Sequence, residues 1–139
     1  AAFLCAQLEV EESIRSERLA LFDAYWSAFA PLAEGLSIEL PSIPPECVGN
    51  GHMFYLIMQS AEVRACFIEQ MAAKGITTPF HYVPLHSAPA GRRFGRVSGE
   101  LPVTDEVSSR LVRLPMFFEL GRDVNTVIAA AEETLRALA

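Results

Sequence analysis

The chain has 139 residues, enough for one folded domain, and its 51% hydrophobic and 20% charged residues exclude an intrinsically disordered protein. Its formal net charge of −6 excludes a binder of the nucleic-acid backbone, because such binding needs many Lys and Arg side chains to neutralise phosphates. No apolar run is long enough to span a bilayer, and no secretory signal is visible.

The chain has three cysteines and a single lysine, Lys74. Cys5, Cys47 and Cys66 are widely spaced and form no C-x-x-C pair, which predicts reduced, buried thiols in a cytoplasmic protein. The chain starts without methionine in what reads as the middle of a helix, so we expect a piece of a longer protein.

The first third predicts one long helix over residues 1–33. Its aromatic and aliphatic side chains recur at three- and four-residue spacing, which gives an apolar stripe. The stripe consists of Phe22, Tyr25, Trp26, Phe29 and Leu32. Pro31 in the last turn and Gly35 after it are typical of a helix end.

Strand and helix signals then alternate. Residues 37–40 predict a short strand that ends at Pro41, and residues 52–58 predict a strand covered on both faces. Ser60 is expected to cap a helix that runs to Lys74. Residues 78–83 predict a further strand at an edge of the sheet.

A long loop, residues 84–102, precedes the last elements, and loops of this length are usually functional. Thr104 is expected to cap a short helix, residues 111–116 predict a third strand, and residues 124–138 predict an amphipathic helix. The sum is an α+β domain with a small, mostly antiparallel sheet packed with helices.

The segment FHYVPLHSAPAGRRFGR, residues 80–96, carries most of the candidate chemistry. His86 follows a rigid proline turn at a strand end, where an imidazole can contact a hydroxyl or phosphoryl oxygen or move a proton. A histidine that satisfies loop carbonyls is the alternative. His81 and Tyr82 alternate along the predicted strand, which favours a structural histidine and a core tyrosine with its hydroxyl at the rim.

Basic residues and metal ligands must also be weighed in this part of the chain. Arg92, Arg93 and Arg96 lie between glycines and could hold a diphosphate, although a solvated loop is the alternative. Zinc would accept side chains of the types found at Cys47, His52, His81 and His86. Their spacing differs from that of standard structural zinc sites, so we predict no metal ligand.

Four segments together resemble the DegT/StrS family of sugar aminotransferases, which use pyridoxal phosphate (PLP). They are FHYVPLHSAPAGRRFGR, SSRLVRLPMFFEL, AAFLCAQLE and IELPSIPPECVGNGHMFY, in the family's order. The similarity is greatest to the branch that makes dTDP-4-amino-4,6-dideoxygalactose.

The resemblance implies the C-terminal small domain of a fold-type-I aminotransferase, with residues 1–33 as a helix that leads in from a large domain and residues 34–139 as the α+β body. It implies a homodimer that transfers an amino group, with glutamate as the expected donor, to a dTDP-4-keto-6-deoxyhexose. In the family the large domain carries the lysine that binds PLP, so residues 1–139 alone should be inactive.

The resemblance also assigns roles to single residues. His86 matches the second histidine of the family's HY-x-PLH pattern, at the sugar-nucleotide side of the active site, whereas His81 matches the first. Tyr82, Arg92 and Arg93 occupy matching positions and are further substrate-binding candidates. The alternative from a different class is a non-catalytic regulatory domain that holds a nucleotide or another anion.

Overall fold

The computed structural model describes residues 1–139 and confirms the α+β class. Its elements in chain order are α1 (Ala2–Leu8), α2 (Glu11–Phe29), the 3-10 turn η1 (Ala30–Leu32), β1 (Phe54–Ile57), α3 (Ala61–Ala73), α4 (Pro89–Phe94), α5 (Pro102–Arg110), β2 (Leu111–Leu114), the 3-10 turn η2 (Leu120–Arg122) and α6 (Val124–Leu138). None of the helices is both long enough and apolar enough to cross a membrane.

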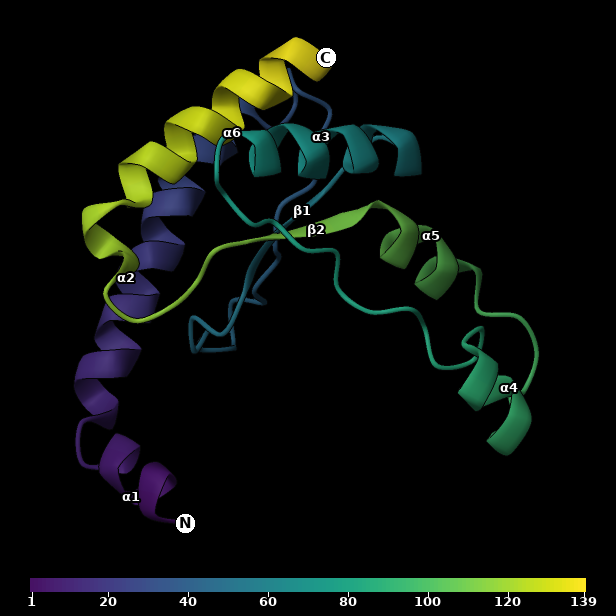
Figure 1. Ribbon diagram of the computed structural model, residues 1–139, viewed down its shortest axis with the longest axis horizontal. Coiled ribbons are helices and arrows are strands. Elements are labelled where there is room, and N and C mark those ends of the chain that lie inside the picture. The colour runs from purple at the N-terminus through teal and green to yellow at the C-terminus, as the bar shows by residue number, and fades with distance from the viewer.

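The molecule has a compact centre and two extensions (Figure 1). The strands β1 and β2 cross the middle, and α2, α3 and α6 pack together on one side. From this centre α1 continues beyond α2 in one direction, and the segment that carries α4 and α5 extends in another. We call residues 80–105 the arm.

The sheet has two antiparallel strands, with Phe54 opposite Leu114 and Ile57 opposite Leu111. One further bridge flanks each strand, Glu39 to Ile57 and Phe80 to Val112. The prediction of strands at residues 37–40 and 78–83 is therefore wrong. Each of these segments forms only a single bridge to the sheet. Prolines explain this, because Pro41 and Pro79 have no N–H to extend a ladder.

An aromatic cluster connects α2 to the sheet. The rings of Tyr25 and Phe29 lie 5.2 and 6.4 Å from that of Phe54, and all three side chains are fully buried. Burial of each such side chain contributes about 2–3 kcal/mol. The Tyr25 hydroxyl donates to the carbonyl of Pro115 at 2.9 Å, and desolvation raises the pKa of Tyr25 above its usual range.

Arg18 fastens α2 to the loops at the same end of both strands. Its guanidinium donates to the carbonyls of Gly51 at 3.0 Å and Met116 at 2.9 Å, and also to that of His52. Gly51 has a φ of +61°, and a Cβ there would lie 2.7 Å from the backbone of Arg18. This close approach requires glycine.

Several helix predictions also need correction. The helix expected over residues 1–33 is interrupted at Glu9 and Val10, because α1 buries no residue that would hold it in line with α2. Ser60 caps α3 as expected, accepting from the Val63 N–H at 3.3 Å. Thr104 is not a cap, since α5 begins two residues earlier at Pro102, a residue favoured in the first turn.

The predicted loop 84–102 and the predicted state of the thiols differ from the structure as well. The short helix α4 lies within that loop, with Pro89 in its first turn. All three cysteines are exposed, so the expectation of buried thiols is wrong. The predicted final helix, 124–138, is confirmed, and its buried side chains pack against α2 and α3.

Candidate functional site

The polar part of the arm starts with a tight turn, Pro84–Ala88. The N–H groups of Ser87 and Ala88 both donate to the carbonyl of Pro84, at 3.1 and 2.9 Å. The Ser87 hydroxyl donates to the same oxygen at 3.1 Å. Proline fixes one backbone angle of this turn, and three hydrogen bonds close it, so the turn sets the direction of His86.

Helix α4 packs directly against this turn through Gly91. Gly91 is the only buried residue of α4, and a Cβ placed on it would lie 1.6 Å from the carbonyl oxygen of Leu85. A side chain larger than hydrogen cannot fit at that distance. The glycine therefore allows the helix and the turn to form one rigid unit around His86.

His86 is held from its other side by α5. Its Nε2 lies 2.9 Å from Oδ1 of Asp105, in the first turn of that helix. The His86 side chain is 16% exposed, whereas that of Asp105 is 56% exposed. The imidazole is thus oriented by two elements and still reaches solvent. No local sequence signal predicts this contact, because nineteen positions separate His86 from Asp105 in the chain.

A groove of about 820 Å³ opens beside the imidazole. Its walls come from the turn, α4, the loop after α4 and the start of α5. They consist of Pro84, Leu85, His86, Ala90, Gly91, Phe94, Gly95, Arg96, Val97, Ser98, Leu101 and Thr104. The walls are mostly apolar and carry no carboxylate, so His86, Arg96 and two hydroxyls are available to a polar or anionic ligand.

The other candidate residues lie outside this groove. Arg92 and Arg93 are exposed on the last turn of α4, and the Arg93 guanidinium lies over the Phe94 ring at 5.0 Å. Tyr82 is 69% exposed, so its expected place in the core is wrong. Its ring contacts that of His81 at 4.7 Å, and the two side chains do not occupy opposite faces because the segment is not a strand.

The possible zinc ligands are not brought together. No group of three or more His, Cys, Asp or Glu side chains is arranged to hold a metal ion. Cys47 and His52 belong to the loop before β1, whereas His86 belongs to the arm. The Nε2 atom of His86 is hydrogen-bonded to Asp105. The structure therefore gives no support to the zinc alternative.

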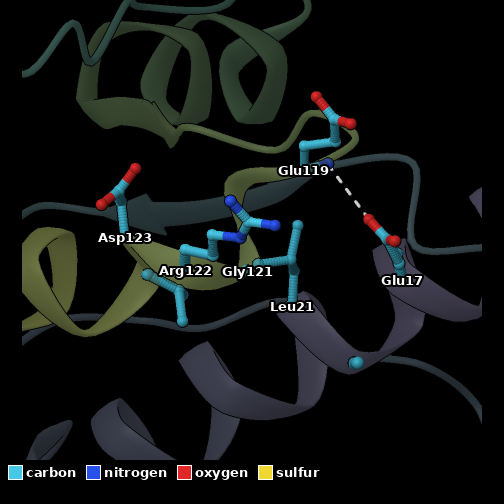
Figure 2. Close-up of a pocket in the computed structure, with 8 residues that line it drawn as sticks. Glu17, Leu21, Glu119, Gly121, Arg122 and Asp123 are labelled. Atoms are coloured by element: carbon cyan, nitrogen blue, oxygen red, sulfur yellow. Dashed lines mark hydrogen bonds between the residues drawn. The ribbon is translucent and has the colours of Figure 1, made fainter.

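A second cavity, of about 590 Å³, lies between α2 and η2. Figure 2 shows Glu17 and Leu21 on one side and Arg122 and Asp123 on the other, with the Glu119 N–H donating to the Glu17 carboxylate at 3.0 Å. Its walls carry three carboxylates and one guanidinium, so they repel an anion. The arm groove is the better site for a negatively charged ligand.

The only lysine lies outside the arm and forms an ion pair with the last helix. Lys74 follows α3, and its Nζ pairs with the carboxylate of Glu133 on α6 at 2.8 Å. It is absent from the walls of the arm groove. Lys74 therefore belongs to the packing of α3 against α6, which agrees with its place at the end of a helix.

Residues 1–132 match the DegT/DnrJ/EryC1/StrS aminotransferase family. The chain belongs to this family. The match covers almost the whole chain, including α1, the arm and most of α6.

Two of the curated relatives are named as aminotransferases of dTDP-linked sugars. The dTDP-3-amino-3,4,6-trideoxy-alpha-D-glucose transaminase of Micromonospora megalomicea subsp. nigra is 28% identical over 87% of this chain and 32% of its own length. The dTDP-4-dehydro-2,3,6-trideoxy-D-glucose 4-aminotransferase of Saccharopolyspora spinosa is 30% identical over 69% of this chain and 24% of its own length. The chain thus spans about a third or less of the length of these relatives.

Solved aminotransferases share the fold. TlmJ from Streptoalloteichus hindustanus superposes with a TM-score of 0.83 at 23% identity, over 97% of this chain and 35% of its own. DesV from S. venezuelae, solved with a ketimine intermediate, gives a TM-score of 0.79 at 30% identity, over 96% of this chain and 35% of its own. Both likenesses cover the arm as well as the packed centre.

Members of this family depend on PLP, and the residues of this chain do not suffice to hold that cofactor. PLP enzymes bind the cofactor to a lysine. Lys74 is paired with Glu133 and is the only lysine present. The groups that this chain can offer near its groove are His86, Arg96 and hydroxyls, which suit a substrate and not a Schiff base.

Proposed function

We propose that residues 1–139 form the C-terminal domain of a PLP-dependent aminotransferase of dTDP-linked keto sugars, and that the arm groove holds part of the sugar nucleotide. Residues 1–33 lead in from a larger domain, and residues 34–139 form the α+β body. The larger domain supplies PLP and its lysine, so this domain alone has no turnover. The enzyme works as a cytoplasmic homodimer with glutamate as amino donor.

The observation that carries the proposal is the position of His86 in the groove. The imidazole is fixed by the turn and by Asp105, and it lines a mostly apolar cavity of about 820 Å³. A fixed polar group in an apolar groove suits recognition of a sugar ring, whose faces are apolar and whose edges carry hydroxyls.

Charge supports the same assignment. A dTDP-sugar carries a diphosphate, and Arg96 is the only ionised group on the groove walls at neutral pH when His86 is uncharged. Arg92 and Arg93 stand on the neighbouring turn of α4 and reinforce the positive potential. We assign them to attraction of the diphosphate, and we assign Tyr82 to the outer end of the substrate.

The C4 position of the sugar is the finer part of the proposal. One curated relative is named for a 3-amino sugar and another for amino transfer at C4, so the relatives alone do not choose between the two carbons. The choice of C4 rests on the resemblance of the sequence to the dTDP-4-amino-4,6-dideoxygalactose branch. The test is incubation of the complete protein that contains this chain with PLP, glutamate and a dTDP-4-keto-6-deoxyhexose. We expect a 4-amino sugar, identified by mass spectrometry and NMR.

The same assay separates the alternatives. A 3-keto substrate that is aminated in place of the 4-keto sugar would contradict the C4 assignment while leaving the sugar aminotransferase intact. No amine from any dTDP-keto sugar would contradict the proposed function. Residues 1–139 alone serve as a control and should give no product.

A further inference from the structure

The hydrogen bond between His86 and Asp105 has a defined donor. An ionised carboxylate only accepts hydrogen bonds, so Nε2 of His86 must carry the proton that lies between the two side chains, 2.9 Å apart. Asp105 is in the first turn of α5, where the helix dipole favours a negative charge. The backbone N–H of Asp105 donates to the carbonyl of Leu101 at 3.0 Å, which anchors the backbone of Asp105 in the helix.

The other ring nitrogen of His86, Nδ1, is free to bind a ligand. No side chain or backbone group of the chain forms a hydrogen bond with Nδ1 of His86. In a neutral imidazole with the proton on Nε2, Nδ1 has a lone pair and no proton. It can accept a hydrogen bond from a hydroxyl, but it has nothing to donate to a phosphoryl oxygen.

We infer that Asp105 is a positioning residue that holds His86 as the Nε2–H tautomer, so that Nδ1 accepts a hydrogen bond from a hydroxyl group of the sugar. This inference rests on the proposed function and narrows it. His86 thus binds the sugar, and the arginines of α4 and of the loop that follows it bind the diphosphate. Asp105 contacts no ligand and acts only through the imidazole.

A double-mutant cycle in the complete protein tests this role. Asp105→Ala should lower kcat/KM for the sugar nucleotide roughly tenfold, the loss of a charged hydrogen bond, with KM for glutamate unchanged. In a His86→Ala background the same substitution should have no further effect. Asp105→Glu should recover part of the loss. Glu69→Ala removes an exposed carboxylate from α3, away from the walls of the groove, and should leave kcat/KM unchanged.

Tautomer measurement gives a second, independent readout. Protein with ¹⁵N-labelled histidines, studied by multiple-bond ¹H–¹⁵N spectra at about pH 8.5, where imidazole is ordinarily neutral, should show His86 as Nε2–H. The signal is assigned from its loss in His86→Gln. A wild-type ring protonated on Nδ1 would overturn the inference.

The kinetic outcomes separate the inference from the function on which it rests. If His86→Ala lowers kcat/KM but Asp105→Ala does not, only the role of Asp105 is overturned. Equal losses from Asp105→Ala in both backgrounds would also overturn it, because Asp105 would then act without His86. If His86→Ala itself has no effect, the substrate-binding role of His86 is wrong as well.

Discussion

Replacing Gly91 by alanine adds one methyl group where α4 meets the turn Pro84–Ala88. The new Cβ would lie 1.6 Å from the carbonyl oxygen of Leu85 and 2.6 Å from its carbon. Real Cβ atoms essentially never come within 3.0 Å of such an atom, so helix and turn must separate by about 1.4 Å. The obstruction is backbone, which cannot rotate away as a side-chain tip would.

Movement of the turn displaces His86, which lies one residue after Leu85. A misplacement of about 1 Å can cost on the order of a hundredfold in rate, so we expect kcat/KM for the sugar nucleotide to fall between tenfold and a hundredfold. Stability should change little. Helix α5 buries no residue and α4 buries only Gly91, and alanine is a better helix former than glycine by about 1 kcal/mol.

Steady-state kinetics and urea unfolding of the complete protein test this separation of activity from stability. Gly121→Ala is the matched control, because nothing lies within 4 Å of a Cβ at that position. A Gly91→Ala protein with kcat/KM within twofold of wild type would refute the argument. So would a fall in activity that is fully explained by global unfolding.

Three further substitutions test the packing of the domain. Tyr25→Phe leaves the Pro115 carbonyl without its donor and should lower the free energy of unfolding by about 1–2 kcal/mol in urea titrations. Because burial raises the pKa of Tyr25 in the folded state, wild-type stability should decline as pH rises above about 10, and Tyr25→Phe should lack that contribution. Arg18→Lys keeps the charge but loses the forked contacts, and should cost about 1–3 kcal/mol by the same titration. Ser60→Ala should cost about 1 kcal/mol, whereas Thr104→Ala, which removes no cap, should cost far less; equal losses would contradict the assigned helix starts.

The spacing of hydrophobic residues in the sequence was sufficient to predict those helices and strands whose buried side chains follow that spacing. The last helix, 124–138, buries residues at helical spacing, and the strand 54–57 is a continuous apolar run. Prolines were harder to interpret. Residues 78–83 were expected to form an edge strand, but the missing N–H of Pro79 leaves only the bridge between Phe80 and Val112.

The candidate site was predictable in part. The turn before His86 is visible in the sequence, and the family resemblance selected that histidine. Its partner Asp105 was not predictable, because the contact depends on how α5 folds back along the arm. The positions of Arg92 and Arg93 outside the groove depend on the rotation of the short helix α4, and the position of Arg96 on the groove wall depends on the path of the loop after it.

The most direct test of the account is the effect of His86→Ala on the complete protein, with His52→Ala as an exposed histidine outside the groove for comparison. We predict that His86→Ala raises KM or lowers kcat for the dTDP-sugar and leaves KM for glutamate unchanged, while His52→Ala changes neither. Wild-type kinetics for His86→Ala with the dTDP-sugar would contradict the assignment of the arm groove as the sugar-nucleotide site.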